Sequence, residues 1–165
     1  MDDRIAFLIA KLVLIPHPEG GFYREVYRSV SEVQPRDNRP ARDALTTIYF
    51  LLTAGQHSRW HRVLSDEVWH FYEGDPLELF ILDTDKDERT RALLGPVSTT
   101  DSEQRPVHVV PAGRWQAART MGTYTLVGCT VAPGFDFADF SLIIGDSEEI
   151  AAIRRAFPGI CDDNG

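Results

Sequence analysis

Basic residues are scarce in this sequence relative to acidic ones. Lysine and arginine together number 17, aspartate and glutamate 25, and the formal net charge is −8 at pH 7. No run of five basic side chains occurs, and the acids are scattered rather than gathered in a tail. Because proteins that bind DNA or RNA present a basic surface, we expect no nucleic-acid polymer as a partner.

Cysteine is rare as well. The two cysteines, Cys129 and Cys161, lie far apart and form no CxxC pair, so the disulfide framework of a small secreted domain is excluded. A bond between the two is left open. Cys129 stands in the apolar run YTLVGCTVA, and we interpret it as a small buried core residue.

Long apolar segments are missing too. Nothing approaches the roughly 20 apolar residues that a membrane helix needs. The N-terminal stretch MDDRIAFLIAKLVLIPHPEGG opens with acids, is interrupted by Lys11 and has no small-x-small cleavage site. We therefore expect no signal peptide and no membrane partner, and we predict a cytoplasmic protein.

Several motifs of well-known sites are also absent. The chain has no GxSxG, no GxGxxG and no Walker lysine. The HPEGG segment at 17–21 is therefore not a phosphate loop, and we interpret His17 and Glu19 as structural residues of a turn. Asp136 and Asp139, between phenylalanines, are interpreted as turn and cap residues.

What the sequence does contain is a series of short β-patterned segments. Runs rich in β-branched and aromatic residues alternate with turn clusters, which is typical of a sandwich or barrel rather than of βαβ units. The runs are TTIYFLLT, SRWHRV, EVWHFYEG, LELFIL, VHVVP, WQAAR, TYTLVGCTV and FADFSLII. Helical spacing predicts short helices at about 3–14, capped by Asp2 or Asp3, and at about 147–157, where Asp146 and Glu149 have capping-box spacing. The 165 residues fit one domain, 1–165, with GFYREVYRS as an edge strand and 31–43 as a surface loop.

The segment HSRWHRVLSDEVWHFYEG (57–74) carries the chemistry. Residues two apart in a strand share a face, so His57, Arg59 and His61 are expected on one side. If the two halves form a hairpin, His61 meets Glu67 across it. A third polar group, Gln116, would come from the strand that follows PAG.

This pattern resembles the cupins, whose motifs are written G-x5-H-x-H-x3,4-E-x6-G and G-x5-P-x-G-x2-H-x3-N. His61 stands at the second histidine of the first motif, Glu67 follows it with one residue more than the usual gap, and Gly74 closes the motif at the expected spacing. Pro111-Ala112-Gly113 matches part of the second motif. Three positions depart from them: Arg59 replaces the first histidine, Gln116 the third and Thr120 the asparagine. The leading glycine of neither motif falls at its expected spacing.

A closer resemblance covers nearly the whole chain. The segments HPEGGFYREVYRS, SRWHRVLSDEVWHFYEGDPLELF, VPAGRWQAAR and YTLVGCTVAPGFDFADFSL are similar, in this order, to the cupin 5 family, cupins of unknown biochemical function. The resemblance implies an all-β, cupin-type double-stranded β-helix (jelly roll) over about 21–145, an internal pocket and a homodimer. The fold is also similar to barrels of the dTDP-4-dehydrorhamnose 3,5-epimerase type, which suggests carbohydrate chemistry but implies no known reaction.

Three interpretations of the site remain open. The first is a metal-free pocket in which Arg59, His61 and Glu67 bind a polar or anionic ligand. The second is a divalent transition metal on His61, Glu67 and Gln116, although an amide is a weak donor and the permanent charge of Arg59 repels a cation. The third is a structural network without a ligand. We favour the first and expect no resident cofactor.

The favoured interpretation gives each residue a role. His61 carries the proton, Glu67 orients it and Arg59 contacts an anion. Further ligand contacts are assigned to Tyr49, Trp69, Phe71 and Gln116. The predicted function is a small-molecule-binding cupin, specifically a carbohydrate or nucleotide-sugar isomerase or epimerase. The alternatives are a metal-dependent cupin enzyme and a binding or sensor protein without turnover, so catalysis itself is left open.

Overall fold

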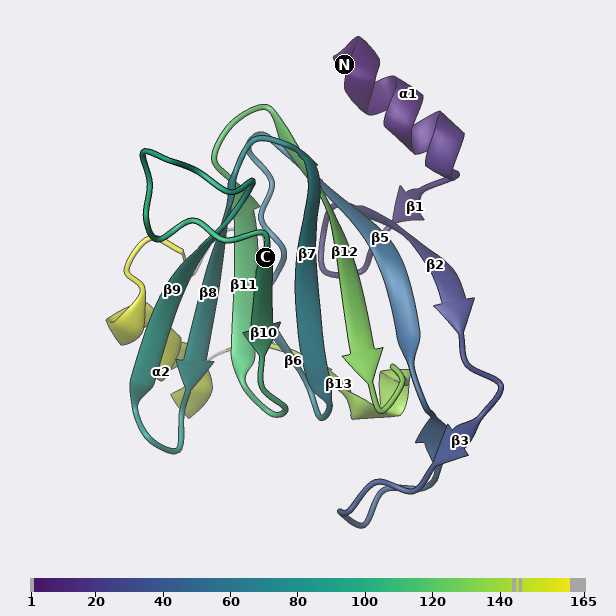
Figure 1. Cartoon of the computed structure of the whole chain (residues 1–165). Helices are drawn as coiled ribbons and strands as arrows, with labels where there is room; N and C mark the ends of the chain where they lie inside the picture. Colours follow the sequence, from purple (N-terminus) through teal and green to yellow (C-terminus); the bar gives the residue numbers. More distant parts are fainter. Residues whose placement is uncertain (1, 144, 146, 161–165) are drawn as a thin grey trace.

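The computed structural model describes residues 2–143, 145 and 147–160 (Figure 1). In chain order, the first elements are α1 (Asp3–Leu12), β1 (Ile15–Pro16), β2 (Phe22–Arg28), β3 (Glu32–Val33), β4 (Arg42–Asp43) and β5 (Thr46–Thr53). They are followed by β6 (His61–Val63), β7 (Asp66–Gly74), β8 (Leu77–Asp83), β9 (Glu88–Leu94) and β10 (Val107–Val110). The last are β11 (Trp115–Thr120), β12 (Tyr124–Ala132), the short 3-10 helix η1 (Phe137–Asp139), β13 (Phe140–Leu142) and α2 (Glu148–Ala156).

Two antiparallel sheets pack face to face. One has six strands in the order β1-β2-β5-β12-β7-β10, and the other has five in the order β13-β6-β11-β8-β9. A small β3-β4 hairpin projects beyond the sandwich (Figure 1). The predicted all-β jelly roll with two terminal helices is confirmed, with sheets that do not close into a continuous barrel.

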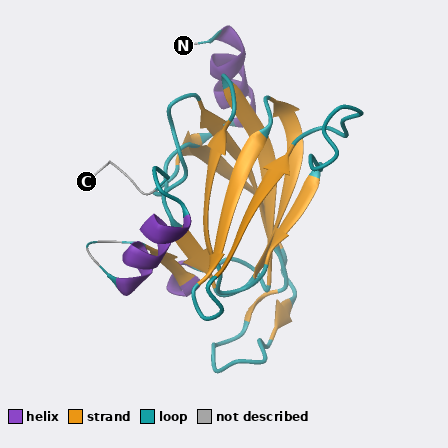
Figure 2. Ribbon diagram, turned by 90° about the vertical axis from the view of Figure 1, so that its left-hand side faces the viewer, coloured by secondary structure: helices purple, strands orange, loops and turns teal. Residues whose placement is uncertain are grey.

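Each sheet also packs against a helix through its outer face. Figure 2 shows α2 beside the strands and α1 at their upper end. Strand alternation explains this arrangement: on β5, Phe50 belongs to the core between the sheets, whereas Leu51 packs with α1. On β8, Leu79 lies in the core and Phe80 packs against Phe157 under α2. Both strands are therefore buried on both faces, although the sheets are antiparallel.

The helices end close to where their sequence patterns end. The Asp2 side chain accepts a hydrogen bond from the N–H of Arg4 at 2.8 Å and caps α1, as predicted. Ser147 caps α2, and the Asp146 cap predicted for this helix lies outside the described residues, as does Cys161. In the described part of the chain, no helix is long and apolar enough to cross a membrane.

Several segments differ from the sequence predictions. The predicted surface loop at 31–43 contains the β3-β4 hairpin. The charged run ERTRALL forms the edge strand β9, which was missed because its mostly exposed residues lack an apolar pattern. FADFSLII was predicted to be one strand but begins with η1, whose cap is Asp136. Here the interpretation of Asp136 as a cap residue is correct.

The loop at 31–43 is anchored to the sandwich. Arg42 forms a two-pronged ion pair with Asp139, at 2.8 and 2.9 Å, and Arg39 reaches the same carboxylate at 2.8 Å. Asp139 is only 3% exposed, and these partners lower its pKa. Its role is thus to hold this loop, beyond the turn or cap role expected of it.

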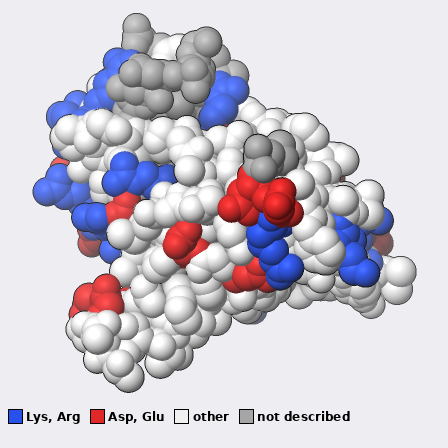
Figure 3. Space-filling model, turned by 90° about the horizontal axis from the view of Figure 1, so that it is seen from above, with Lys and Arg blue, Asp and Glu red and all other residues white. Residues whose placement is uncertain are grey.

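The outer surface near α1 mixes both signs of charge. Acidic and basic side chains lie interspersed among uncharged residues on the face seen from above (Figure 3). Arg4 on α1 pairs with Glu73 on β7 at 2.7 Å, and Tyr124 donates to the same carboxylate at 2.8 Å. Tyr124 therefore belongs to this outer network.

The space between the sheets falls into two parts. The filled half is a close-packed apolar cluster, consisting of Phe50, Leu52, Trp69, Leu77, Leu79, Ile81, Leu94, Val110, Ala118, Val127 and Cys129. The hollow half is a cavity at the other end of the same strands, and it contains most of the buried polar groups discussed below. Cys129 lies at the boundary and belongs to both.

Candidate functional site

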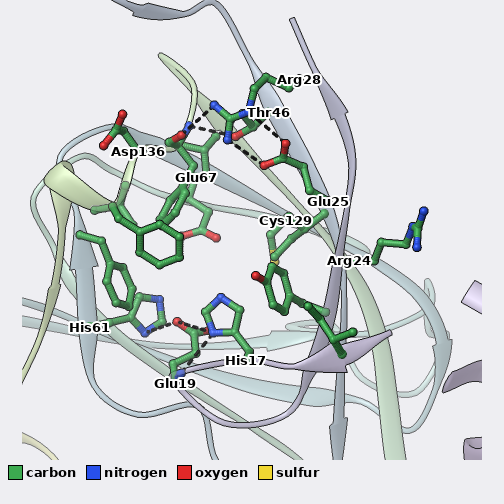
Figure 4. A pocket seen from close by; sticks show the side chains of 18 of the residues that line it. His17, Glu19, Arg24, Glu25, Arg28, Thr46, His61, Glu67, Cys129 and Asp136 are labelled. Carbon is green, nitrogen blue, oxygen red and sulfur yellow. Dashed lines mark hydrogen bonds and ion pairs between the residues drawn. The ribbon is translucent and has the colours of Figure 1, made fainter. Parts of the chain in front are cut away.

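The cavity has a volume of about 620 Å³ and opens to solvent beside exposed apolar side chains (Figure 4). Its size lies within the range of small-molecule sites. Its polar lining consists of His17, Glu19, Tyr23, Arg24, Glu25, Arg28, Thr46, His61, Glu67, Cys129 and Asp136. Its apolar lining consists of Val13, Ile15, Ile48, Val63, Val131, Phe135, Phe137 and Phe140.

The HPEGG turn brings two of these polar groups into the sandwich. The His17 N–H donates to the Gly21 carbonyl, and the Gly20 N–H donates to the His17 carbonyl, both at 3.0 Å. Gly21 has φ +73°, and a Cβ on it would lie 2.7 Å from the Leu51 carbonyl oxygen. Only glycine fits there, and the tight turn directs Glu19 inward.

His17 is held in one tautomer. Its Nδ1 accepts the backbone N–H of Glu19 at 3.1 Å, so the proton of the neutral ring sits on Nε2. The ring stacks edge-on against Tyr23 at 4.4 Å between centroids. Burial and the charge of His61 lower the pKa of His17 to about 4, so the ring is neutral at physiological pH.

His61 adopts the opposite tautomer. Its Nδ1 lies 2.8 Å from the Arg59 carbonyl oxygen, which can only accept, so Nδ1 carries the proton. Nε2 is therefore the basic nitrogen of the neutral ring. His61 is 2% exposed, and burial lowers its pKa to about 4, against the raising effect of the Arg59 carbonyl.

Glu19 connects the two imidazoles. Its Oε2 lies 3.1 Å from Nδ1 of His61 and 3.9 Å from Nδ1 of His17, as the dashed lines of Figure 4 show. Burial raises the pKa of Glu19 well above its usual value, and the charge of Glu67 raises it further. Burial therefore favours the protonated, uncharged form of the Glu19 carboxyl group.

Glu67 is the fourth buried titratable group of the cavity. It accepts a hydrogen bond from Nε2 of Gln116 at 2.5 Å and one from the Cys129 thiol. Burial raises its pKa to about 7, although both hydrogen bonds act in the lowering direction. A carboxyl group in this state can both donate and accept a proton near neutral pH.

Glu67 and His61 do not meet across a hairpin as expected. β6 pairs with β11 and β13 in one sheet, whereas β7 pairs with β10 and β12 in the other. The chain crosses between the sheets at 64–65, so the two side chains line the cavity from opposite walls. Glu67 therefore does not orient His61: Glu19 and the Arg59 carbonyl lie against its ring instead.

The expectation that Arg59 points into the pocket is wrong. Its side chain is exposed and is not part of the cavity lining. The strand begins only at His61, and Ser58 is the buried residue of the preceding segment, bonded to the backbone of Ala118 at 2.8 Å in both directions. Arg59 contributes only its backbone to the site, where its N–H donates to the Glu19 carbonyl at 2.6 Å.

The remaining expected contacts lie outside the cavity lining. Trp69, 1% exposed, and the half-buried Phe71 pack in or against the filled half, and Tyr49 packs with the α1 cluster. Gln116 is buried between Trp69 and Glu67: its oxygen accepts the Trp69 indole N–H at 3.1 Å while its amide donates to Glu67. Their positions along the strands place these side chains either in the filled half or on the outer face of the sheet, and not in the cavity.

The proposed metal ligands do not fit a metal. The Gln116 oxygen accepts from Trp69 and its nitrogen donates to Glu67, so this amide has no atom left for an ion. Within 2–143, 145 and 147–160, no three His, Cys, Asp or Glu side chains are arranged to hold an ion. This donor set therefore supports proton chemistry better than metal coordination.

Sequence reasoning missed His17, Glu19 and the phenylalanines at the cavity mouth. His17 and Glu19 were interpreted as structural, yet both are largely buried and face His61. Tyr23 also lines the cavity. The HPEGG segment did contain a signal for this site. A histidine and an acid beside a tight Gly-Gly turn are costly to bury unless they have polar partners, so their burial would have predicted a polar site.

Comparison with protein families gives one clear match. Residues 6–143 match the family model Cupin_5, described as Cupin superfamily (DUF985). No curated protein is similar enough in sequence to count as a match.

Two similar solved structures are of proteins whose names carry no function. A hypothetical protein from Leishmania major is 34% identical with a TM-score of 0.77, over 93% of this chain and 92% of that one. A protein from Shewanella oneidensis is 35% identical with a TM-score of 0.76, over 96% and 92%. Oxalate decarboxylase from Bacillus subtilis, 17% identical with a TM-score of 0.58, aligns with 83% of this chain and 33% of its own, which shows a shared fold only.

Proposed function

The chain belongs to the Cupin_5 family of the cupin superfamily, and on that premise we propose that it is a small-molecule isomerase or epimerase. The substrate class is a carbohydrate or nucleotide sugar that carries a carbonyl group. The reaction moves a proton on a carbon next to that carbonyl, and the chain's own acid and base carry it out without a metal.

One observation carries this proposal: a neutral imidazole and a carboxyl group near half-protonation face one cavity from opposite walls. His61 has its basic Nε2 available above pH about 4, and Glu67 keeps its proton below pH about 7. Acid–base catalysis requires an unprotonated base and a protonated acid at the working pH. Between these values both groups are in the required form.

The reaction needs one base and one acid. Nε2 of His61 removes the proton from the carbon, and the electron pair of that C–H bond forms the double bond of an enediol. Glu67 donates its proton to the carbonyl oxygen, so no charge accumulates on the substrate. Return of a proton to the neighbouring carbon, with loss of the hydroxyl proton of the first carbon, gives the isomer. Return of a proton to the other face of the first carbon, with loss of the proton that Glu67 donated, gives the epimer. In both cases the Glu67 carboxylate takes up the hydroxyl proton, so both catalytic groups end in their starting forms.

The orientation of His61 comes from its neighbours. A proton bound at Nε2 makes the ring cationic, and the Arg59 carbonyl stabilises the Nδ1–H bond in this state. Glu19 lies 3.1 Å from the same nitrogen and can take up that proton if it ionises. Glu19 and His17 are thus positioning residues of this proposal.

Deuterium incorporation tests the proposed chemistry. The full chain is incubated in D2O with a panel of sugars and nucleotide sugars, and incorporation at carbon is followed by NMR. His61→Ala and Glu67→Gln are expected to slow the exchange by about 10²–10⁴-fold. His57→Ala, an exposed histidine outside the cavity, is the matched control. Binding of a panel member with no incorporation by the wild type contradicts catalysis and indicates a binding protein.

The pH profile is a second test of the same assignment. Because the base must be unprotonated and the acid protonated, kcat/KM is expected to rise through pH about 4 and fall through pH about 7. Glu67→Gln removes the upper limb, since the amide that replaces the carboxyl group does not titrate. An upper limb that persists in this variant belongs to another group and contradicts the role of Glu67.

We also propose that the chain forms a homodimer through β2. The two residues of β1 cover only Phe22 and Tyr23, and in the described chain no strand pairs with the rest of that edge. Val26 and Tyr27 are about half exposed along it. Light scattering after size-exclusion chromatography should give twice the chain mass, and Val26→Lys should reduce it to one. A monomeric wild type contradicts this proposal.

A further inference from the structure

We propose that the cavity is selective for uncharged ligands, so that the substrate is a free sugar rather than a sugar phosphate or nucleotide sugar. This inference rests on the proposed function and narrows its substrate class. It follows from how the cationic side chains of the cavity are used. Size does not distinguish the candidates, because about 620 Å³ accommodates either.

Arg28 is the cationic group nearest the polar interior, and its charge is already balanced. Its Nε and Nη2 donate to the two oxygens of Glu25 at 2.9 and 2.7 Å. Its Nη1 donates to Asp43 at 2.8 Å and to the Phe135 carbonyl at 3.1 Å. Four donors are therefore occupied, out of the five that a guanidinium has, and two carboxylates face one positive charge.

Arg24 does not offer a guanidinium to a ligand in the cavity either. Figure 4 shows its side chain extending away from the cavity, into which Glu67, Glu19 and His61 point. Arg24 and Arg28 are the cationic residues of the described lining, which contains no lysine. A phosphate in the cavity would therefore lose its hydration without gaining a free guanidinium or ammonium partner.

The two histidines do not supply positive charge either. Both are neutral above pH about 4, and His61 offers a lone pair at Nε2 rather than a donor. Glu67 gains negative charge as the pH passes about 7. Apart from Arg24 and Arg28, the side chains that an anionic ligand meets in the lining are neutral or negative, and this disfavours its binding.

The rest of the lining suits an uncharged ring. Phe135, Phe137 and Phe140 form a wall with centroid distances of 5.0, 5.8 and 6.1 Å, and Phe137 is 60% exposed at the mouth. The C–H face of a sugar ring packs on such a wall, while its hydroxyl and carbonyl groups meet the donors and acceptors opposite. The ring centroids of His61 and Phe140 are 5.6 Å apart, so this wall extends to the imidazole proposed as the base.

Matched pairs of sugars test the selectivity. Binding of ribose and ribose 5-phosphate, fructose and fructose 6-phosphate, and galactose and galactose 1-phosphate is measured on the full chain by saturation-transfer NMR. In every pair that binds, the uncharged member is expected to bind at least about ten-fold more tightly. Equal or tighter binding of the phosphorylated member overturns the inference. So does the absence of binding by all uncharged members at their highest soluble concentrations.

Glu25→Gln sharpens the test, because it releases the Arg28 guanidinium from its two-pronged partner. The affinity for the phosphorylated member relative to its uncharged partner is expected to rise about ten-fold. Glu88→Gln, which removes one exposed carboxylate of β9, is the charge-matched control and should leave the ratio unchanged. An equal rise in both variants means that overall charge, not Arg28, sets the selectivity, and it contradicts the inference.

The outcomes also separate this inference from the proposed reaction. Uncharged sugars that bind without deuterium incorporation contradict proton transfer and support the selectivity. Incorporation confined to phosphorylated or nucleotide sugars supports proton transfer and overturns the selectivity.

Discussion

The filled half and the hollow half are built by the same strands but follow different physical rules. On β5, Thr46 and Ile48 line the cavity, whereas Phe50 and Leu52 belong to the core. On β7, Glu67 lines the cavity and Trp69, two residues further on, is fully buried in the core. Each strand thus changes from an open, polar environment to a dry one within two residues on one face.

This difference shows how the fold tolerates its buried polar groups. Gln116 joins the two halves, because it accepts from Trp69 on one side and donates to Glu67 on the other. Burying a carboxyl group without partners is costly, and the amide supplies the partner at the boundary. The filled half provides rigidity, and the hollow half carries groups whose pKa values are shifted by burial.

The largest expected effect is a difference between the two halves in how much a truncated side chain lowers the free energy of unfolding. Ile81→Ala in the filled half should lower the free energy of unfolding by about 2–5 kcal/mol, because it leaves a cavity among close-packed neighbours. Ile48→Ala, the same change beside existing empty space, should cost less than about 1 kcal/mol. Urea unfolding followed by circular dichroism measures both. Equal losses would mean that the hollow half is packed as tightly as the core.

A second effect concerns pH. Glu67 has a pKa of about 7 in the folded protein against an ordinary value of 4.5, so the folded state binds more protons between these values. Its contribution is fully present at low pH and is lost as the pH rises through about 7. Relative to Glu67→Gln, the wild type should therefore lose about 3 kcal/mol of stability between pH 4.5 and pH 7.5.

The measurement is urea unfolding of both proteins at several pH values. The opposing contributions of His17 and His61, whose lowered pKa values add stability as the pH rises, are common to both proteins and cancel in the difference. A difference that does not change with pH shows that Glu67 titrates normally.

The smallest effect comes from adding volume. Ala118→Val should destabilise the filled half by about 1–3 kcal/mol, because the residue is 1% exposed and has no room beside it. Val131→Leu in the cavity wall should change stability by less than about 0.5 kcal/mol, since the added methylene enters free space. The midpoint of thermal unfolding compares them. A larger loss for Val131→Leu would reverse the assignment of the two halves.

Local pattern was sufficient to predict most of the fold. β5 and β8 were found because their apolar runs are bounded by turn residues, and the ends of α1 followed its cap and spacing. β9 was missed because an edge strand exposed to solvent needs no apolar face. The distribution of strands between two sheets, which puts β6 and β7 on opposite walls, depends on long-range pairing that spacing does not encode.

The site was predictable only in part for the same reason. His61 and Glu67 were found through their motif, but Glu19 reaches His61 from a turn about 40 residues earlier in the chain. Arg59 was placed wrongly because strand alternation was extended across Ser58, where the backbone leaves the strand. Alternation is reliable within a strand and fails where the strand ends.

The hydrogen bond between the Trp69 indole and Gln116 gives the molecule an internal optical reporter. Indole emission responds to the polarity and charge around its N–H group, and here one amide separates that group from Glu67. A molecule that engages Glu67 will therefore change the colour or intensity of light emitted from a residue it never touches. Occupancy of the cavity can thus be followed in an unlabelled protein.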